Sequence, residues 1–182
     1  VSKYRNLPIK NYQNKDHPIQ KELVKLIEDL SKYKIKNIGV DGCTLPNPLI
    51  PLKKFALATA QLADYKKLGE YSTIARRIFD SCIKFPEITG GSKSTNSILT
   101  KLSKGRAFFK NGAEGVFVAI IPEKKAALAV KIIDGAARAA EVTIAGLISE
   151  LKIINSYQIE KIKKRPIKNS VGKIIGSMKW IG

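Results

Sequence analysis

The chain has 182 residues, 44% of them hydrophobic, and a net charge of +18 from 33 basic and 15 acidic side chains. This length and composition suit one domain with a packed core, and no stretch reaches the roughly 18 uncharged apolar residues that a membrane span needs. The basic start, VSKYRNLPIK, lacks the apolar core of a secretory signal, and two cysteines, Cys43 and Cys82, give no disulfide framework. We therefore expect a cytoplasmic protein with reduced thiols and no membrane partner.

The positive charge raises the question of a polyanionic partner, because lysine and arginine contacts to phosphates drive nucleic-acid binding. The basic residues are scattered in pairs, only KIKKR at 161–165 forms a run, and the 7% of aromatic residues do not interleave with them. The excess of lysine, isoleucine and asparagine is typical of an AT-rich genome. The composition thus disfavours nucleic acid as a partner. The alternative function that stays open is that of a non-catalytic basic protein that binds nucleic acid or an acidic partner.

In the first half of the chain the apolar spacing predicts three helices and a strand. Residues 18–33 form the first helix, with Pro18 in its first turn. IKNIGVDG is typical of a short strand, and a proline-stiffened turn follows it. An amphipathic helix is expected over 52–68 and another within 69–84.

In the second half, Pro86 and the GGSKSTN cluster interrupt the helices, and a further helix is expected from 95 to 102. Three short apolar runs, GRAFFK, GVFVAIIP and AALAVKII, predict antiparallel strands with a hairpin at PEKK (122–125). DGAARAAEVTIAGLISELKII predicts a long helix, and VGKIIGSMKW a last strand. The order of the elements predicts an α+β or mixed α/β fold.

Three motifs suggest chemistry but are better explained otherwise. GGSKST (90–95) lacks the glycine before lysine and the spacing of a phosphate loop, so it is interpreted as a solvated loop. The only histidine, His17, stands at a helix start, where capping or packing is the default role. Ser-x-x-Lys pairs, which can mark a serine nucleophile with a lysine base, are expected by chance in so lysine-rich a chain. They are Ser31/Lys34, Ser81/Lys84, Ser149/Lys152 and Ser170/Lys173.

Two further motifs stay open on the residues alone. KNGAEG (110–115) places a lysine beside small residues at a strand end, which suits either an oxyanion site or a hairpin turn with an exposed lysine. VDGC (40–43) joins a carboxylate and a thiol at the end of a strand. Cys43 there is either a ligand for a soft metal or a small apolar filler in a turn.

Four stretches together resemble the asparaginase II family, the Rhizobium type. They are KDHPIQ (15–20), VDGCTLPNPLIPL (40–52), KNGAEGVFVAIIPEKKAALAVKIIDGAARAAE (110–141) and RPIKNSVGKIIG (165–176). The resemblance implies a partial serine β-lactamase or penicillin-binding-protein-like fold, with helices before an antiparallel meander and a C-terminal helix. It also implies hydrolysis of L-asparagine to L-aspartate and ammonia by a serine nucleophile with paired lysines and a nearby zinc ion.

By the same resemblance, Lys110 is the lysine partnered with an active-site serine, and KNG takes the place of the Lys-Thr-Gly signature. Asp41 holds the substrate through its α-amino group, Cys43 is one zinc ligand, and Gly112 lies on the strand edge facing the substrate. A homodimer is compatible with the family.

The sequence also departs from the family pattern. Its Ser-x-x-Lys nucleophile and its Cys-Ser-Gly-Lys-His motif are expected before KDHPIQ, and neither stands in these 182 residues. GSKSTN carries Lys93 where the family has arginine, and Thr95 near its acidic position. We therefore expect residues 1–182 to form a single incomplete domain, the C-terminal portion of a truncated asparaginase that is inactive alone.

Overall fold

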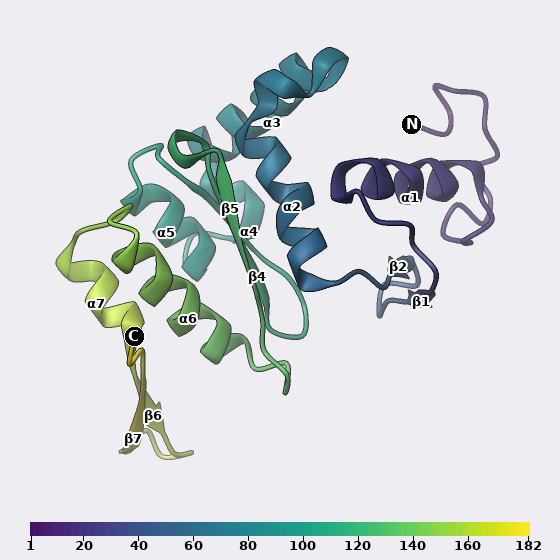
Figure 1. The fold of residues 1–182 in the computed structure, drawn as a ribbon. Helices are drawn as coiled ribbons and strands as arrows, with labels where there is room; N and C mark the ends of the chain where they lie inside the picture. The colour runs from purple at the N-terminus through teal and green to yellow at the C-terminus, as the bar shows by residue number, and fades with distance from the viewer. The chain divides into compact units, whose positions relative to one another are not determined.

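The computed structural model describes all residues from Val1 to Gly182. The chain divides into two compact units, Val1–Ala58 and Thr59–Gly182, and each is described by itself. Helices and small antiparallel sheets are mixed throughout, which confirms the α/β or α+β class expected from the sequence (Figure 1). The expectation of a single domain stays a prediction. None of the helices combines the length and the apolar character needed to cross a membrane.

The first unit is built around helix α1, Pro18–Ser31. His17 caps it: its Nδ1 accepts a hydrogen bond from the Ile19 N–H at 3.2 Å, and its Nε2 donates to the Pro8 carbonyl at 2.7 Å. The capping role predicted for the only histidine is thus confirmed. The helix ends at Ser31, and the following residue, Lys32, adopts the left-handed conformation. The Glu28 carboxylate accepts from the Ile35 N–H at 2.8 Å.

A β-hairpin follows, with β1 at Ile38–Val40 and β2 at Pro46–Pro48. The strand β1 was predicted, whereas the segment LPNP was interpreted as part of a turn, and that prediction was wrong. The Asp41 N–H donates to the Leu45 carbonyl at 2.9 Å, which makes Asp41 and Leu45 a hydrogen-bonded pair. Hydrogen-bonded and non-hydrogen-bonded pairs alternate along an antiparallel ladder, so the next pair, Val40 and Pro46, is not hydrogen-bonded. Both prolines of β2 therefore occupy positions at which an N–H would point away from β1, which is why the strand tolerates them.

The helices between the hairpin and the central sheet run from Leu52 to Leu102. The predicted helix over 52–68 is α2, which ends at Ala63 because the backbone of Asp64 is non-helical. The helix expected from 95 to 102 is confirmed with those bounds. A short helix that begins at Pro86 was not predicted. The elements of this segment are α2 (Leu52–Ala63), η1 (Tyr65–Lys67), η2 (Gly69–Tyr71), α3 (Ser72–Lys84), α4 (Pro86–Gly90) and α5 (Thr95–Leu102).

The second unit contains the predicted antiparallel meander, in the order β3-β4-β5. The strands are β3 (Phe108–Asn111), β4 (Val116–Ile121) and β5 (Ala126–Lys131), with η3 (Pro122–Lys124) in the predicted hairpin. Five consecutive residues of β4, 117–121, are buried, so both faces of this central strand are covered. The helix α6, Ala137–Glu150, packs against β4 and β5 and closes the core (Figure 1).

After α6 the chain forms α7 (Tyr157–Lys163), β6 (Lys164–Lys168) and β7 (Ile174–Lys179). Only the last strand was predicted. β6 and β7 pair antiparallel as a separate hairpin, with a bulge between Ile167 and Lys168. Trp180 holds the base of this hairpin against α6. The Trp180 ring packs against Gly146, and the Trp180 Nε1–H donates to the Glu150 carboxylate at 2.6 Å.

Candidate functional site

The turn between β1 and β2 holds the VDGC motif. Thr44 N–H donates to the Asp41 carbonyl at 2.8 Å, and Thr44 itself adopts a positive φ of 67°. A β-branched residue in this region is strained by about 1–3 kcal/mol, and such strain commonly collects at ligand sites. Nothing in the residue pattern singles out Thr44, because a positive φ at a threonine leaves no signal in the sequence.

Asp41 and Cys43 lie together in this turn. The Cys43 Sγ–H donates to the Asp41 carboxylate at 3.1 Å, and both residues are exposed. The hydrogen bond from this thiol has the largest effect in lowering the pKa of Asp41 below its ordinary value. The backbone N–H groups of Gly42 and Cys43 lower the pKa further. Donors that favour the charged form keep the carboxylate ionised, so Asp41 presents a negative charge to solvent.

Replacing Cys43 by alanine is therefore expected to raise the pKa of Asp41 toward its ordinary value, because the largest source of the shift is lost. The pKa of Asp41 is lower in the folded protein than in the unfolded chain, so ionised Asp41 stabilises the fold. This stabilisation is fully present above the unfolded-state pKa and is lost as the pH falls through the folded-state pKa. An NMR titration of the Asp41 carboxyl carbon measures the change. Cys82→Ala serves as the control, since Cys82 is not among the groups that lower the pKa of Asp41. An Asp41 titration that is identical in Cys43→Ala and in the parent protein would contradict the assigned cause.

The residues of this turn do not complete a zinc site. Zinc in proteins takes four ligands in a tetrahedral arrangement, and no group of three histidine, cysteine, aspartate or glutamate side chains lies together in the chain. Both ring nitrogens of His17 are used within α1 and its neighbouring loop. Cys82 lies on α3, where burial raises the pKa of its thiol and disfavours the thiolate that metals bind. The turn offers only Cys43 and Asp41, two of the four ligands that zinc takes.

Lys110 and Gly112 lie at the other predicted position, the end of β3. The Lys110 Nζ donates to the Asn111 carbonyl at 2.6 Å and to the Asn111 Oδ1 at 3.2 Å. Gly112 N–H donates to the Val116 carbonyl at 2.8 Å, and Val116 N–H donates to the Ala113 carbonyl at 3.2 Å. These two N–H groups are already engaged, so the structure favours the hairpin-turn interpretation of KNGAEG over an oxyanion site.

The structure therefore brings together two pairs of predicted residues, Asp41 with Cys43 and Lys110 with Gly112. The first pair belongs to the unit Val1–Ala58 and the second to the unit Thr59–Gly182. Each pair shares one β-hairpin, as the sequence order requires.

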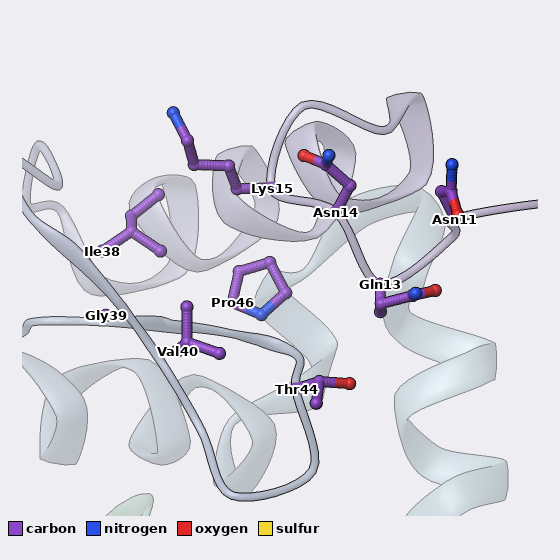
Figure 2. Close-up of a pocket in the computed structure, with 9 residues that line it drawn as sticks. All are labelled: Asn11, Gln13, Asn14, Lys15, Ile38, Gly39, Val40, Thr44 and Pro46. Atoms are coloured by element: carbon purple, nitrogen blue, oxygen red, sulfur yellow. The ribbon is translucent and has the colours of Figure 1, made fainter.

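A cavity of about 520 Å³ adjoins the VDGC turn within the first unit (Figure 2). One side is the face of the hairpin that carries Ile38, Val40 and Pro46. The other side is a loop rich in carboxamide side chains, in which the Asn14 Oδ1 already accepts from the Asp16 N–H at 2.9 Å. Sequence reasoning missed this loop, because isolated asparagine and glutamine residues carry no spacing signal. The lining residues are Asn11, Gln13, Asn14, Lys15, Ile38, Gly39, Val40, Thr44 and Pro46.

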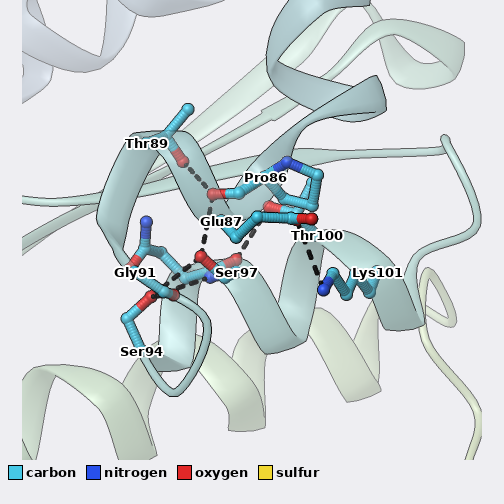
Figure 3. Close-up of polar contacts among 9 residues, drawn as sticks. Pro86, Glu87, Thr89, Gly91, Ser94, Ser97, Thr100 and Lys101 are labelled. Atoms are coloured by element: carbon cyan, nitrogen blue, oxygen red, sulfur yellow. Dashed lines mark hydrogen bonds and ion pairs between the residues drawn. The ribbon is translucent and has the colours of Figure 1, made fainter.

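The glycine-rich segment 90–95 connects the end of α4 to the capped start of α5 (Figure 3). The Ser94 hydroxyl accepts from the Ser97 N–H at 3.4 Å, and the N–H groups of Gly91 and Ser94 donate to nearby carbonyls. These N–H groups cannot cradle a phosphate, which agrees with the rejection of a phosphate loop. Asn96 is buried behind this cap with no hydrogen-bond partner for its amide, which packs against Gly90.

None of the Ser-x-x-Lys serines is placed as a nucleophile. Ser31 is fully buried, and Ser170 lies in the exposed turn between β6 and β7. The Ser81 hydroxyl donates to the Arg77 carbonyl of its own helix at 2.7 Å. Ser149 accepts from Lys163 at 3.4 Å, and the Lys163 ammonium also forms an ion pair with the Glu160 carboxylate. The interpretation of these pairs as chance occurrences is consistent with these contacts.

Comparison with known proteins defines the class. The chain matches the family described as L-asparaginase II over residues 1–180, nearly its whole length. The chain belongs to the L-asparaginase II family, an amidohydrolase family. The resemblance expected from four short stretches is thereby confirmed. No match to a curated protein was found.

Proposed function

We propose that the chain contributes the substrate-binding part of an L-asparaginase, which converts L-asparagine and water to L-aspartate and ammonia. The family match over residues 1–180 carries this proposal. The geometry of the VDGC turn supports it, because a carboxylate held ionised at the surface is suited to bind an α-ammonium group. The adjoining cavity of about 520 Å³ falls in the size range of small-molecule sites.

In this proposal Asp41 binds the α-amino group of the substrate and Lys110 carries protons. Gly112 lies on the strand edge that faces the substrate. A serine oxygen attacks the side-chain carbonyl carbon, the C–N bond breaks, and the nitrogen takes up a proton and leaves as ammonia. Water then hydrolyses the acyl-serine, which releases L-aspartate and restores the hydroxyl.

None of the four Ser-x-x-Lys serines is placed for the first step. We therefore infer that the nucleophile comes from polypeptide beyond these residues that carries Ser-x-x-Lys and Cys-Ser-Gly-Lys-His. That segment would also supply the remaining zinc ligands beside Cys43. The serine β-lactamase-like arrangement, the homodimer and the cytoplasmic location belong to the same proposal.

Ammonia release from L-asparagine by the purified 182-residue protein is the test. We expect no release above the uncatalysed rate from the chain alone, and release when a polypeptide carrying the two serine motifs is added. In that mixture Asp41→Ala should lower kcat/KM by about 10- to 100-fold, because one hydrogen bond to a charged group is lost. Lys124→Ala, an exposed lysine outside the proposed site, is the matched control.

Ammonia release by the chain alone would overturn the inferred external nucleophile. Association of the two polypeptides without any ammonia release would overturn the asparaginase proposal itself. Equal losses in Asp41→Ala and Lys124→Ala would show that Asp41 has no specific role.

A further inference from the structure

The C-terminal hairpin of β6 and β7 extends away from α6 and α7, which it contacts only at its base (Figure 1). Along both strands only Arg165 and Met178 are partly buried. Arg165 pairs with the Glu141 carboxylate of α6 and donates to the Thr95 hydroxyl at 3.2 Å. The base is thus fixed to the body of the unit, whereas the distal end is exposed to solvent. A two-stranded hairpin with no covered face is marginally stable by itself, which favours a surface that covers it.

The hairpin concentrates positive charge. Residues 161–179 contain seven basic side chains and no aspartate or glutamate. Lys163 and Arg165 have carboxylate partners, but Lys164, Lys168, Lys173 and Lys179 form no ion pair. The basic residues look scattered along the sequence, but the fold brings some of them together. Pairing of β6 with β7 places lysines from two chain segments on one hairpin.

Two of these lysines oppose each other directly. Lys164 is the cross-strand partner of Lys179, and Trp180 N–H donates to the Lys163 carbonyl at 2.9 Å. Residues 163 and 180 are thus the hydrogen-bonded pair. Lys164 and Lys179 form the next, non-hydrogen-bonded pair, in which side chains approach most closely. Like charges in such a pair are destabilising, so an anion placed against them stabilises the hairpin.

The distal end adds exposed apolar residues between the lysines. Val171 is 83% exposed, Ile174 is 62% exposed and Ile175 is 64% exposed. Apolar side chains beside lysines and without acidic residues are typical of segments that lie in the interface of an anionic membrane. A nucleic-acid surface fits less well, because β6 and β7 carry no aromatic side chain on which bases could stack. The nearby Trp180 ring is already packed against α6.

We propose that the β6–β7 hairpin docks on an anionic lipid surface, with Val171, Ile174 and Ile175 inserted between headgroups and the four free lysines bound to phosphates and carboxylates. The expectation of no membrane partner rested on the lack of a membrane-spanning stretch, and peripheral docking needs none. This proposal is independent of the asparaginase activity.

Vesicle co-sedimentation with the full 182-residue protein tests the proposal. The protein should bind phosphatidylcholine vesicles that contain phosphatidylserine, and should bind vesicles of phosphatidylcholine alone much less. Lys168→Gln with Lys173→Gln should weaken binding about 25-fold, since each lysine near an anionic surface contributes roughly fivefold. The matched control is Lys21→Gln with Lys25→Gln, which removes the same charge from exposed positions of α1 and should leave binding unchanged within about twofold.

A second variant separates insertion from charge attraction. Ile174→Ser with Ile175→Ser keeps every lysine, and it should weaken the binding that remains at high salt. All variants change exposed positions, so unchanged thermal unfolding verifies that they fold. Equal affinity for both vesicle types or equal loss in the α1 control would overturn the proposal. So would tighter binding to single-stranded nucleic acid than to vesicles, or a concentration-dependent dimer that Ile174→Ser with Ile175→Ser abolishes.

Discussion

Phe109→Ala is expected to destabilise the protein by about 3–5 kcal/mol, because truncating a buried phenylalanine removes apolar contacts and leaves a cavity. Phe109 is fully buried in β3, in a core shared with Leu99 and Ile144. For a chain of this size the loss corresponds to a fall in melting temperature of roughly 10 °C. Thermal unfolding followed by circular dichroism measures it.

Phe85→Ala provides the matched control, since Phe85 is substantially exposed after α3. The same truncation there should cost less than about 1 kcal/mol, because little apolar surface returns to water. If both variants melt at the same temperature, the position of the core given by the structure is wrong.

Gly115→Ala is expected to destabilise the β3–β4 hairpin by about 2–4 kcal/mol. Gly115 has a φ of 68°, and a Cβ built there would lie 2.9 Å from the Ile132 Cβ and 3.1 Å from the Gly135 carbonyl carbon. The substitution therefore combines a strained backbone with overpacking against the loop that follows β5. Denaturation by urea gives the free energy of unfolding.

Gly172→Ala separates the two causes. Gly172 has a φ of 81°, but a Cβ there meets no atom within 4 Å. Only the strain of a positive φ at a residue with a Cβ remains, so we expect Gly172→Ala to destabilise the protein by about 1 kcal/mol. Equal costs at Gly115 and Gly172 would show that the contacts with Ile132 and Gly135 contribute nothing.

The sequence predicted the elements whose apolar spacing is uninterrupted. The helix α5 has the predicted bounds, because Ser94 is a good cap and the apolar residues follow a helical period. The three strands of the central sheet were found because each is apolar and ends in a turn. The helix α2 ended earlier than predicted, at Ala63. The Asp64 side chain there accepts from Lys67 across the following turn, which sequence periodicity does not register.

Two strands were missed for different reasons. β2 contains two prolines, which propensity assigns to turns, although the hydrogen-bond alternation with β1 accommodates both. α7 and β6 lie in the run QIEKIKKRPIK, where lysines suggest a solvated segment. Ile159 and Ile162 nevertheless bury one face of α7. Tertiary packing, which a single sequence does not show, decided both cases.

The candidate site was predictable only in its local parts. Asp41 and Cys43 stand two residues apart in a turn, so their contact follows from chain geometry. The cavity beside them depends on the loop of residues 11–15 meeting the hairpin, and no residue pattern foretells such a meeting. The link between Asp41 and Lys110 came from family resemblance alone, because the two residues are 69 positions apart in the chain.

The prolines of the two hairpins bear on how the protein behaves at high concentration. Pro46, Pro48 and Pro166 all occupy pairs in which a backbone N–H would face outward, and proline has none to offer. The outer edge of β2 therefore has no N–H donor at Pro46 or Pro48, and the outer edge of β6 lacks one at its middle residue. We expect these missing donors to disfavour the addition of another strand, and so of a cross-β fibril, at both edges.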